Sequence, residues 1–95
     1  MDKAALYKAI NDAQFSVEEF EAPPRVFGSW HVVFNRGNQK FRIVYDGRDS
    51  FLSLERNRTL NDWEDNTYVV STTMSSEQKI MQINSWLLNI AKKFD

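Results

Sequence analysis

The chain has 95 residues, of which 42% are hydrophobic and 14% aromatic, so it can bury the core of one domain and is too apolar for intrinsic disorder. It contains no Cys, which excludes disulfides, thiolate metal sites and a Cys nucleophile. The net charge of −1 provides no global field for nucleic acid or for an anionic membrane.

The N-terminal segment 2–14 is predicted to form a helix. Asp2 is a suitable N-cap, and apolar residues recur at helical spacing at Leu6, Ala9, Ile10 and Ala13. The same stretch contains acids and lacks the apolar core of a secretory signal. Residues 15–28 are predicted to be a linker into a sheet, because Pro23 and Pro24 prevent a helix from continuing.

Residues 29–72 are predicted to form an antiparallel sheet of three to four strands in meander order. From Trp30 the apolar residues alternate with a period of two, and Gly37-Asn38 has the composition of a two-residue hairpin turn. Turn chemistry and hydrophobic pattern select the same register. The pairs expected in that register are Trp30 with Tyr45, Val32 with Ile43, and Phe34 with Phe41.

A charged tetrad, Asp46 to Asp49, joins the second strand to the third. It lacks the spread of oxygen ligands that a calcium loop needs, and the cation of Arg48 opposes metal binding. We interpret it as a turn in which Gly47 adopts a positive φ and the Asp side chains bond to turn amides. The expected pairs across it are Asp46 with Phe51, Tyr45 with Leu52, Ile43 with Leu54, and Arg42 with Glu55.

The stretch TYVVST, residues 67–72, is predicted to be the fourth strand, and the polar stretch 57–66 before it a loop. Residues 76–94 are predicted to form a helix, because Ser75 and Gln78 have capping-box spacing and a broad apolar arc follows, including Met81 and Leu88. We therefore predict one α+β domain over residues 1–95, with the N-terminal and C-terminal helices packed on one face of the sheet.

His31 is the single histidine, and it is predicted to lie on the outer face of the sheet. No Ser or Cys near it belongs to a recognisable nucleophile motif, and a typical zinc site requires Cys or further His. We therefore expect no enzymatic activity, no catalytic residue, no metal site and no cofactor.

The basic residues of segment 25–58 suggest a second possibility, a small nucleic-acid-associated regulatory protein. Single-strand binding by a sheet requires exposed aromatic residues, whereas the aromatics of the first two strands are predicted to face the helices. Nucleic acid is therefore the alternative partner rather than the first choice. The basic residues in question are Arg25, Arg36, Lys40, Arg42, Arg48, Arg56 and Arg58.

The predicted outer face of the sheet mixes apolar and charged residues, which leaves two interpretations open. It could bind a protein partner, or segment 58–66 with Trp63 could fold over it. Its expected members are His31, Val33, Arg42, Val44, Phe51, Ser53 and Glu55.

The blocks WHVVF, FRIVYDGRD and LSLE, followed by DWED and INSWLLNI, resemble the small single-domain immunity proteins that bacteria encode beside polymorphic or contact-dependent inhibition toxins. The resemblance covers about residues 28–90. It implies a cytoplasmic, non-enzymatic protein that binds one cognate toxin domain. Many such proteins are strongly acidic, and the net charge of −1 departs from that, which leaves the chemistry of the toxin open.

We therefore predict a protein-binding module that is soluble and cytoplasmic, does not enter a membrane, and is a monomer or a weak dimer. No apolar run approaches the about 18 residues of a membrane span. The predicted partner-binding residues are Phe51, Trp63, Arg48, Asp62, Glu64, Asp65 and His31.

Overall fold

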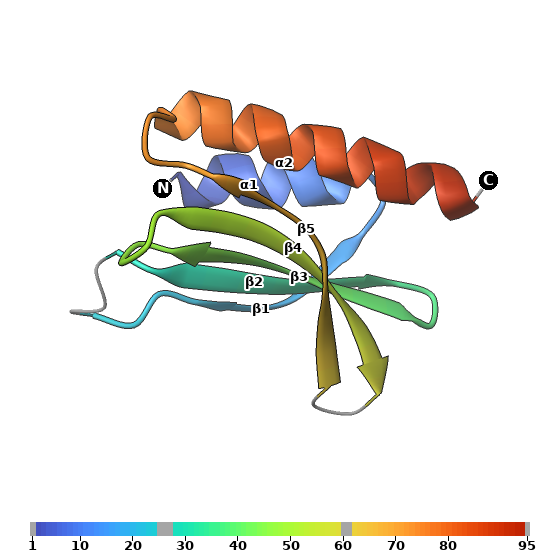
Figure 1. Cartoon of the computed structure of the whole chain (residues 1–95). Helices are drawn as coiled ribbons and strands as arrows, with labels where there is room; N and C mark the ends of the chain where they lie inside the picture. The colour runs from blue at the N-terminus through green and yellow to red at the C-terminus, as the bar shows by residue number, and fades with distance from the viewer. Residues whose placement is uncertain (1, 25–27, 60–61, 95) are drawn as a thin grey trace.

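Two helices lie on one face of a five-stranded antiparallel sheet (Figure 1). The structure, a computed structural model, describes residues 2–24, 28–59 and 62–94, and for residues 59, 65 and 66 the backbone alone. The strands follow chain order across the sheet, so the predicted α+β meander is confirmed, with five strands instead of three to four. The elements are α1 (Lys3–Asp12), β1 (Ser16–Glu21), β2 (Trp30–Arg36), β3 (Gln39–Asp46), β4 (Phe51–Thr59), β5 (Asp62–Val70), α2 (Ser76–Ala91) and a terminal 3₁₀ turn (Lys92–Phe94).

The prediction that residues 15–28 form a linker is wrong, because β1 occupies part of that segment and pairs with β2. A β-bulge explains why the strand was missed. The register shifts between Val17 and Glu19, so that Val17 and Phe20 both face the core although three positions separate them. The extra residue hides the period of two that a sequence pattern would reveal.

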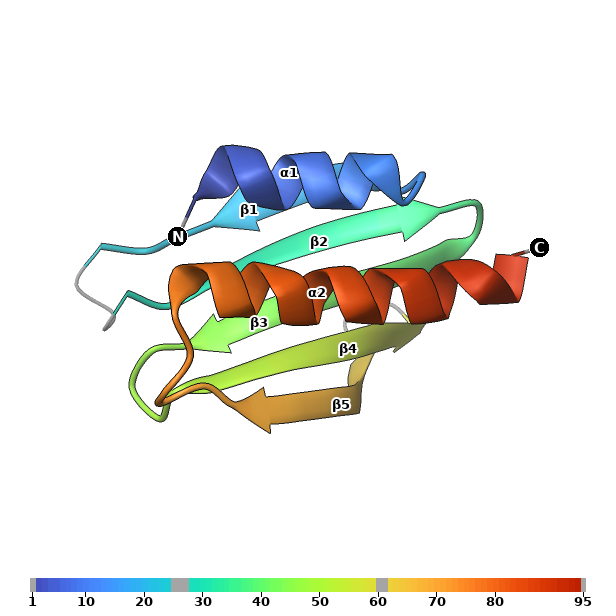
Figure 2. The ribbon, with the colours of Figure 1, turned by 90° about the horizontal axis from the view of Figure 1, so that it is seen from above.

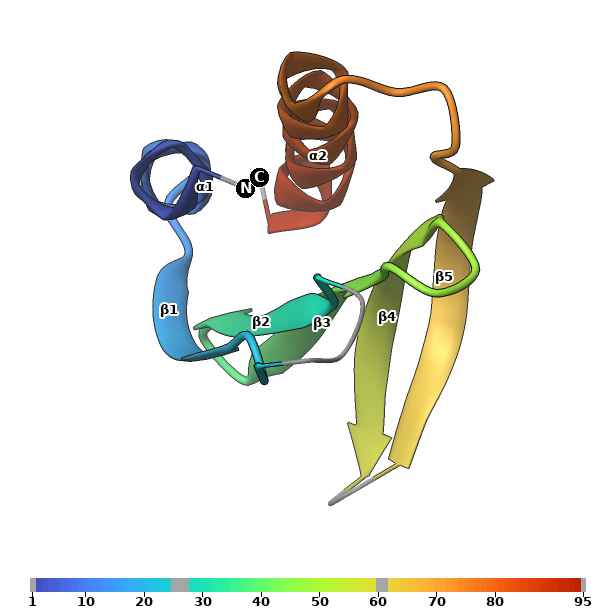
Figure 3. The ribbon, with the colours of Figure 1, turned by 90° about the vertical axis from the view of Figure 1, so that its left-hand side faces the viewer.

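The predicted loop 57–66 is also wrong, because β4 continues to Thr59 and β5 begins at Asp62. The far half of this hairpin projects away from the helices (Figure 3). The helices therefore cover neither of its faces, and its sequence has no reason to alternate between apolar and polar residues. Register shifts after Leu54 and between Asn57 and Thr59 add further irregularity.

Both predicted hairpin registers are confirmed, from Trp30 opposite Tyr45 to Arg42 opposite Glu55. Their inner faces and the two helices enclose one core. Phe15 belongs to this core, with ring centroids 5.3 Å from Phe34, 5.9 Å from Phe41 and 5.8 Å from Phe94. This residue belongs to the segment that the sequence assigned to a linker.

Both helices begin at the caps that the sequence predicts. Asp2 Oδ1 accepts a hydrogen bond from Ala5 N at 3.1 Å, and Ser75 and Gln78 form both bonds of a capping box. The apolar arc of α2 is narrower than expected, since Met81 and Leu88 are 68% and 62% exposed. In the view from above, α1 lies along β1 and α2 lies over β3, running roughly in the direction of the strands (Figure 2).

The charged tetrad is a structural turn, as predicted. Asp46 Oδ1 accepts hydrogen bonds from Arg48 N at 3.0 Å and from Asp49 N at 3.2 Å. The positive φ, however, falls on Ser50 (56°) rather than on Gly47. Two contacts hold the ends of this turn: Gly47 N donates to Ser29 Oγ at 2.9 Å, and the Ser50 carbonyl accepts from Ser71 N at 2.6 Å.

Candidate functional site

The outer face of the sheet, opposite to both helices, is the candidate site (Figure 1). Among the described residues, every buried side-chain nitrogen and oxygen has a hydrogen-bond partner, so no unsatisfied polar group points to a site inside the core. The strand registers place the following side chains on the outer face: Glu19, Glu21, His31, Val33, Lys40, Arg42, Val44, Phe51, Ser53, Glu55, Trp63, Tyr68 and Val70.

Three exposed side chains on β4 and β5, Phe51, Tyr68 and Val70, form what we call the aromatic patch. Their exposed fractions are 38%, 62% and 60%, and the rings of Phe51 and Tyr68 meet edge to face with centroids 5.7 Å apart. Val70 lies directly opposite Phe51 in the β4–β5 register. Beside the patch is an open hollow of about 380 Å³ whose wall includes Val44 and Ser53.

Part of the outer face is covered from within the chain. Arg42 Nε donates to Glu55 Oε1, and the Arg42 guanidinium lies 4.4 Å from the centroid of the Trp63 ring. Trp63 thus covers a half-buried ion pair, which is what the covering interpretation expected of segment 58–66. Val33 next to this pair is 8% exposed, while the aromatic patch stays open.

The predicted partner-binding residues fall into separate groups. Arg48 and Phe51 lie at the β3–β4 turn, whereas Asp62 and Glu64 lie at the far end of the β4–β5 hairpin. There Glu64 Oε2 is 3.5 Å from Arg58 Nη1, and the Asp62 carbonyl accepts from Asn57 Nδ2 at 3.3 Å. Only the backbone of Asp65, paired with Glu55, belongs to the described part.

Sequence reasoning missed Tyr68 and Val70 as members of the site. It placed both in a strand but assigned no register to that strand, so their face was unknown. The signal that finds them is the pairing of Tyr68 with Ser53 and of Val70 with Phe51, because opposite residues share a face.

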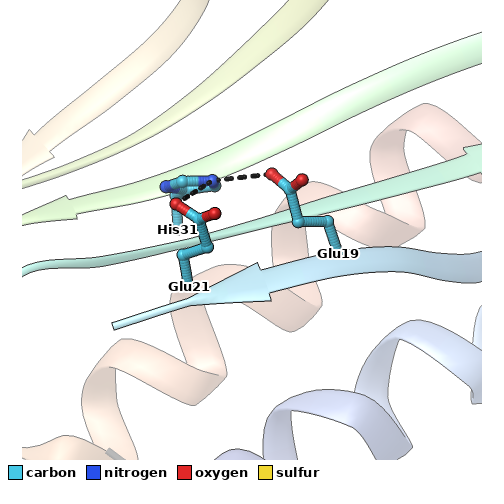
Figure 4. Close-up of side chains that lie close together, drawn as sticks. All are labelled: Glu19, Glu21 and His31. Atoms are coloured by element: carbon cyan, nitrogen blue, oxygen red, sulfur yellow. Dashed lines mark hydrogen bonds and ion pairs between the residues drawn. The ribbon is translucent and has the colours of Figure 1, made fainter. Parts of the chain in front are cut away.

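His31 lies at the other side of the outer face, between two carboxylates of β1 (Figure 4). Its Nε2 is 3.0 Å from Glu19 Oε2 and 3.9 Å from Glu21 Oε2. One ligand atom from each of the three residues lies within 4.8 Å of the others, a set that could hold a divalent cation. The sequence pattern does not bring these residues together, because it predicts a linker where β1 forms.

The groups around His31 do not form a nucleophile and base in the described part of the chain. His31 and Asp46 both line an open hollow of about 400 Å³, together with Ser29. The Ser29 hydroxyl accepts from Gly47 N, while Asp46 Oδ1 accepts from the amides of its own turn. Ser29 Oγ, Asp46 Oδ1 and His31 Nε2 are thus each engaged with other partners, and none of these hydrogen bonds joins His31 to Ser29 or to Asp46.

The pKa of Lys8 on α1 is raised by a hydrogen bond to the Asp12 carboxylate and by its charge. Lys8 Nζ and Asp12 Oδ2 are 2.6 Å apart, and both side chains are well exposed. The pair is a helix surface contact at i,i+4 spacing and adds no site.

Comparison with protein families, with curated proteins and with solved structures gave no match to this chain. Within the described residues, neither helix has the length and apolar character needed to cross a membrane.

Proposed function

We propose that the chain is a non-enzymatic, cytoplasmic protein-binding module of the immunity type, and that it neutralises a cognate toxin domain through the aromatic patch. The single observation that supports this is the exposure of Phe51, Tyr68 and Val70 side by side on one sheet face. Aromatic residues are enriched at protein interfaces relative to the rest of the protein surface, and Trp and Tyr are enriched among the residues that contribute most of the binding energy. A rigid sheet presents them with little conformational cost on binding.

Charged residues surround the aromatic patch and supply the polar rim that interfaces usually have. Asp46 and Glu55 line the hollow beside it. Arg48 belongs to the turn that leads into Phe51. Rim charges of both signs contribute mainly to orientation and association rate, while the buried apolar anchors contribute most of the affinity.

The nucleic-acid alternative receives less support from the basic residues that were its basis. Lys40 Nζ lies 3.2 Å from Glu18 Oε2, and Arg42 and Arg58 each contact a Glu. Arg36 lies over the ring of Phe94, with its guanidinium carbon 4.7 Å from the centroid. Cations that are paired with carboxylates release few counterions from a phosphate backbone, so they provide little electrostatic affinity. Arg25 lies outside the described residues.

The test uses the protein encoded beside the gene of this chain and measures the dissociation constant of the complex between the two proteins by calorimetry. We expect Phe51→Ala and Tyr68→Ala each to weaken binding by about 30-fold, as interface anchors do. Leu88→Ala is the matched control, because Leu88 is 62% exposed on α2, away from the outer face. Far-UV circular dichroism verifies that each variant is folded.

Two results would contradict the proposal. One is the absence of any complex between the chain and the protein encoded beside it. The other is unchanged affinity in both patch variants. The nucleic-acid alternative would be favoured instead if the chain bound DNA or RNA, if that affinity fell steeply with added salt, and if Arg56→Ala lowered it further.

A further inference from the structure

The segment Thr67–Val70 at the outer edge of β5, which we call the open edge, has backbone groups directed away from the sheet. The bond from Ser71 N to the Ser50 carbonyl, at 2.6 Å, fixes the phase of the β4–β5 ladder. Because hydrogen-bonded and non-bonded pairs alternate, Val69 exchanges bonds with Leu52. The N–H and C=O groups of Tyr68 and Val70 therefore point away from β4.

The open edge lacks the features with which sheets usually protect their edges. Such features are charged side chains, Pro, bulges or a covering element. Thr67, Tyr68, Val69 and Val70 carry no charge, and they pair with β4 without a register shift. Seen from above, β5 is the outermost strand, and in the described part of the chain no helix or strand runs along its far side (Figure 2).

We propose that the open edge binds the open edge of a second copy of this chain, antiparallel, about a two-fold axis at Val69. In this arrangement Tyr68 of each copy lies opposite Val70 of the other, and each such pair exchanges both of its outward-directed hydrogen bonds. An extended backbone is the one ligand that satisfies these groups in a row, which is why the occupant is a strand.

A second copy fits this edge for two reasons that concern its side chains. The exposed ring of Tyr68 comes to lie beside the β-branched Val70 of the other copy on the outer face, a favourable cross-strand pair. The acids of the far half of β5, Asp62 and Glu64, fall opposite the stretch after Val70, where the chain has already left the strand. Like charges therefore do not meet across the axis.

The open edge is short, so the dimer should dissociate on dilution. Interfaces well below the standard size are weak, and we expect dissociation between micromolar and millimolar concentrations. The proposal does not rest on the toxin-binding function, although Tyr68 and Val70 belong to both surfaces: the edge pairs through backbone groups and can do so without a toxin.

The first test is a cross-link in the full chain, which has no Cys of its own. The Val69 residues of the two copies face each other on the two-fold axis and form a non-hydrogen-bonded pair. The Cα atoms of such a pair are about 4.5 Å apart, which is within the range of a disulfide. Val69→Cys should therefore form a disulfide-linked dimer under mild oxidation. Leu88→Cys is the control, because this exposed position lies on α2, and it should cross-link only slowly through collisions.

The second test is sedimentation velocity over a hundredfold range of concentration, which also covers the case in which Val69→Cys fails to fold. Val70→Pro removes an outward-directed N–H and leaves the β4–β5 ladder intact, so it should remain monomeric. Val70→Thr keeps the N–H and the branched shape and should associate like the original chain. A chain that is monomeric at every concentration, or Val70→Pro associating as before, would overturn the proposal.

Discussion

The two edge strands of this sheet differ in where their acidic residues lie: those of β1 are spread along the strand, whereas those of β5 lie in its far half. β1 carries Glu18, Glu19 and Glu21, and all three lie near a basic side chain. Glu18 lies 3.2 Å from Lys40 Nζ, and Glu19 and Glu21 lie 3.0 Å and 3.9 Å from His31 Nε2. The open edge of β5 carries no charge at all. The charges of β1 thus oppose pairing with another strand, whereas the open edge of β5 has no charge that would oppose it.

The two edges also differ in how they are attached to the core. β1 follows directly on the buried Phe15, packs Val17 and Phe20 against the core, and contacts α1. The inner residues Thr67 and Val69 of β5 are half-buried, and a hollow of about 270 Å³ separates part of this strand from α2 near Trp86. The comparison teaches that β1 is held by the core, whereas β5 is held mainly by β4.

The largest expected difference in stability is between removing a buried side chain next to β1 and removing a half-buried one on β5. Phe15→Ala should reduce the free energy of unfolding by about 3–5 kcal/mol, because it empties a site filled by a ring that contacts three others. Val69→Ala should cost only about 1 kcal/mol, because its side chain is half-exposed already. Urea denaturation measures both, and equal losses would contradict the difference in attachment.

A smaller effect is expected from the ion pairs at the two sides. Arg42→Ala leaves the Glu55 carboxylate unpaired at 16% exposure under Trp63, and should cost about 1–3 kcal/mol. Lys40→Ala breaks the pair with Glu18, in which both side chains are more exposed, and should cost less than about 1 kcal/mol. Thermal unfolding of the two variants tests the order, and a larger loss for Lys40→Ala would reverse it.

The smallest effect concerns the charges of β1 themselves. Replacing both Glu19 and Glu21 by Thr should open the β1 edge and raise the average mass in sedimentation equilibrium slightly at the highest concentration. A variant with Asp12→Asn and Glu77→Gln changes the net charge by the same amount away from the sheet, since both residues lie on helices. Equal association of the two variants would show that net charge, rather than the edge, is responsible.

The sequence predicts the middle of this fold well because local turn chemistry and alternation agree there. Gly37-Asn38 and the Asp46 turn each set a register that the hydrophobic pattern also favours. The pattern fails where a strand departs from its period, at the bulge between Val17 and Glu19, and where a strand has no buried face, in the far half of the β4–β5 hairpin.

The candidate site follows the same division. Phe51 could be placed on the outer face, because its register depends on a recognisable turn. Tyr68 and Val70 could not, because the register shifts of β4 and β5 separate them from any turn that fixes their pairing. Glu19 and Glu21 were hidden together with β1, so the carboxylates around His31 emerge only once the strand is known.

The meander order of the sheet has a consequence for how the chain folds. Each strand pairs only with its neighbours in sequence, so the sheet can grow hairpin by hairpin with short loop closures and little entropic cost. The contact between α1 and α2 is different, because it joins opposite ends of the chain. We expect the sheet to form quickly and the docking of α2 to limit the folding rate. Until α2 docks, the inner face of the sheet remains open to water.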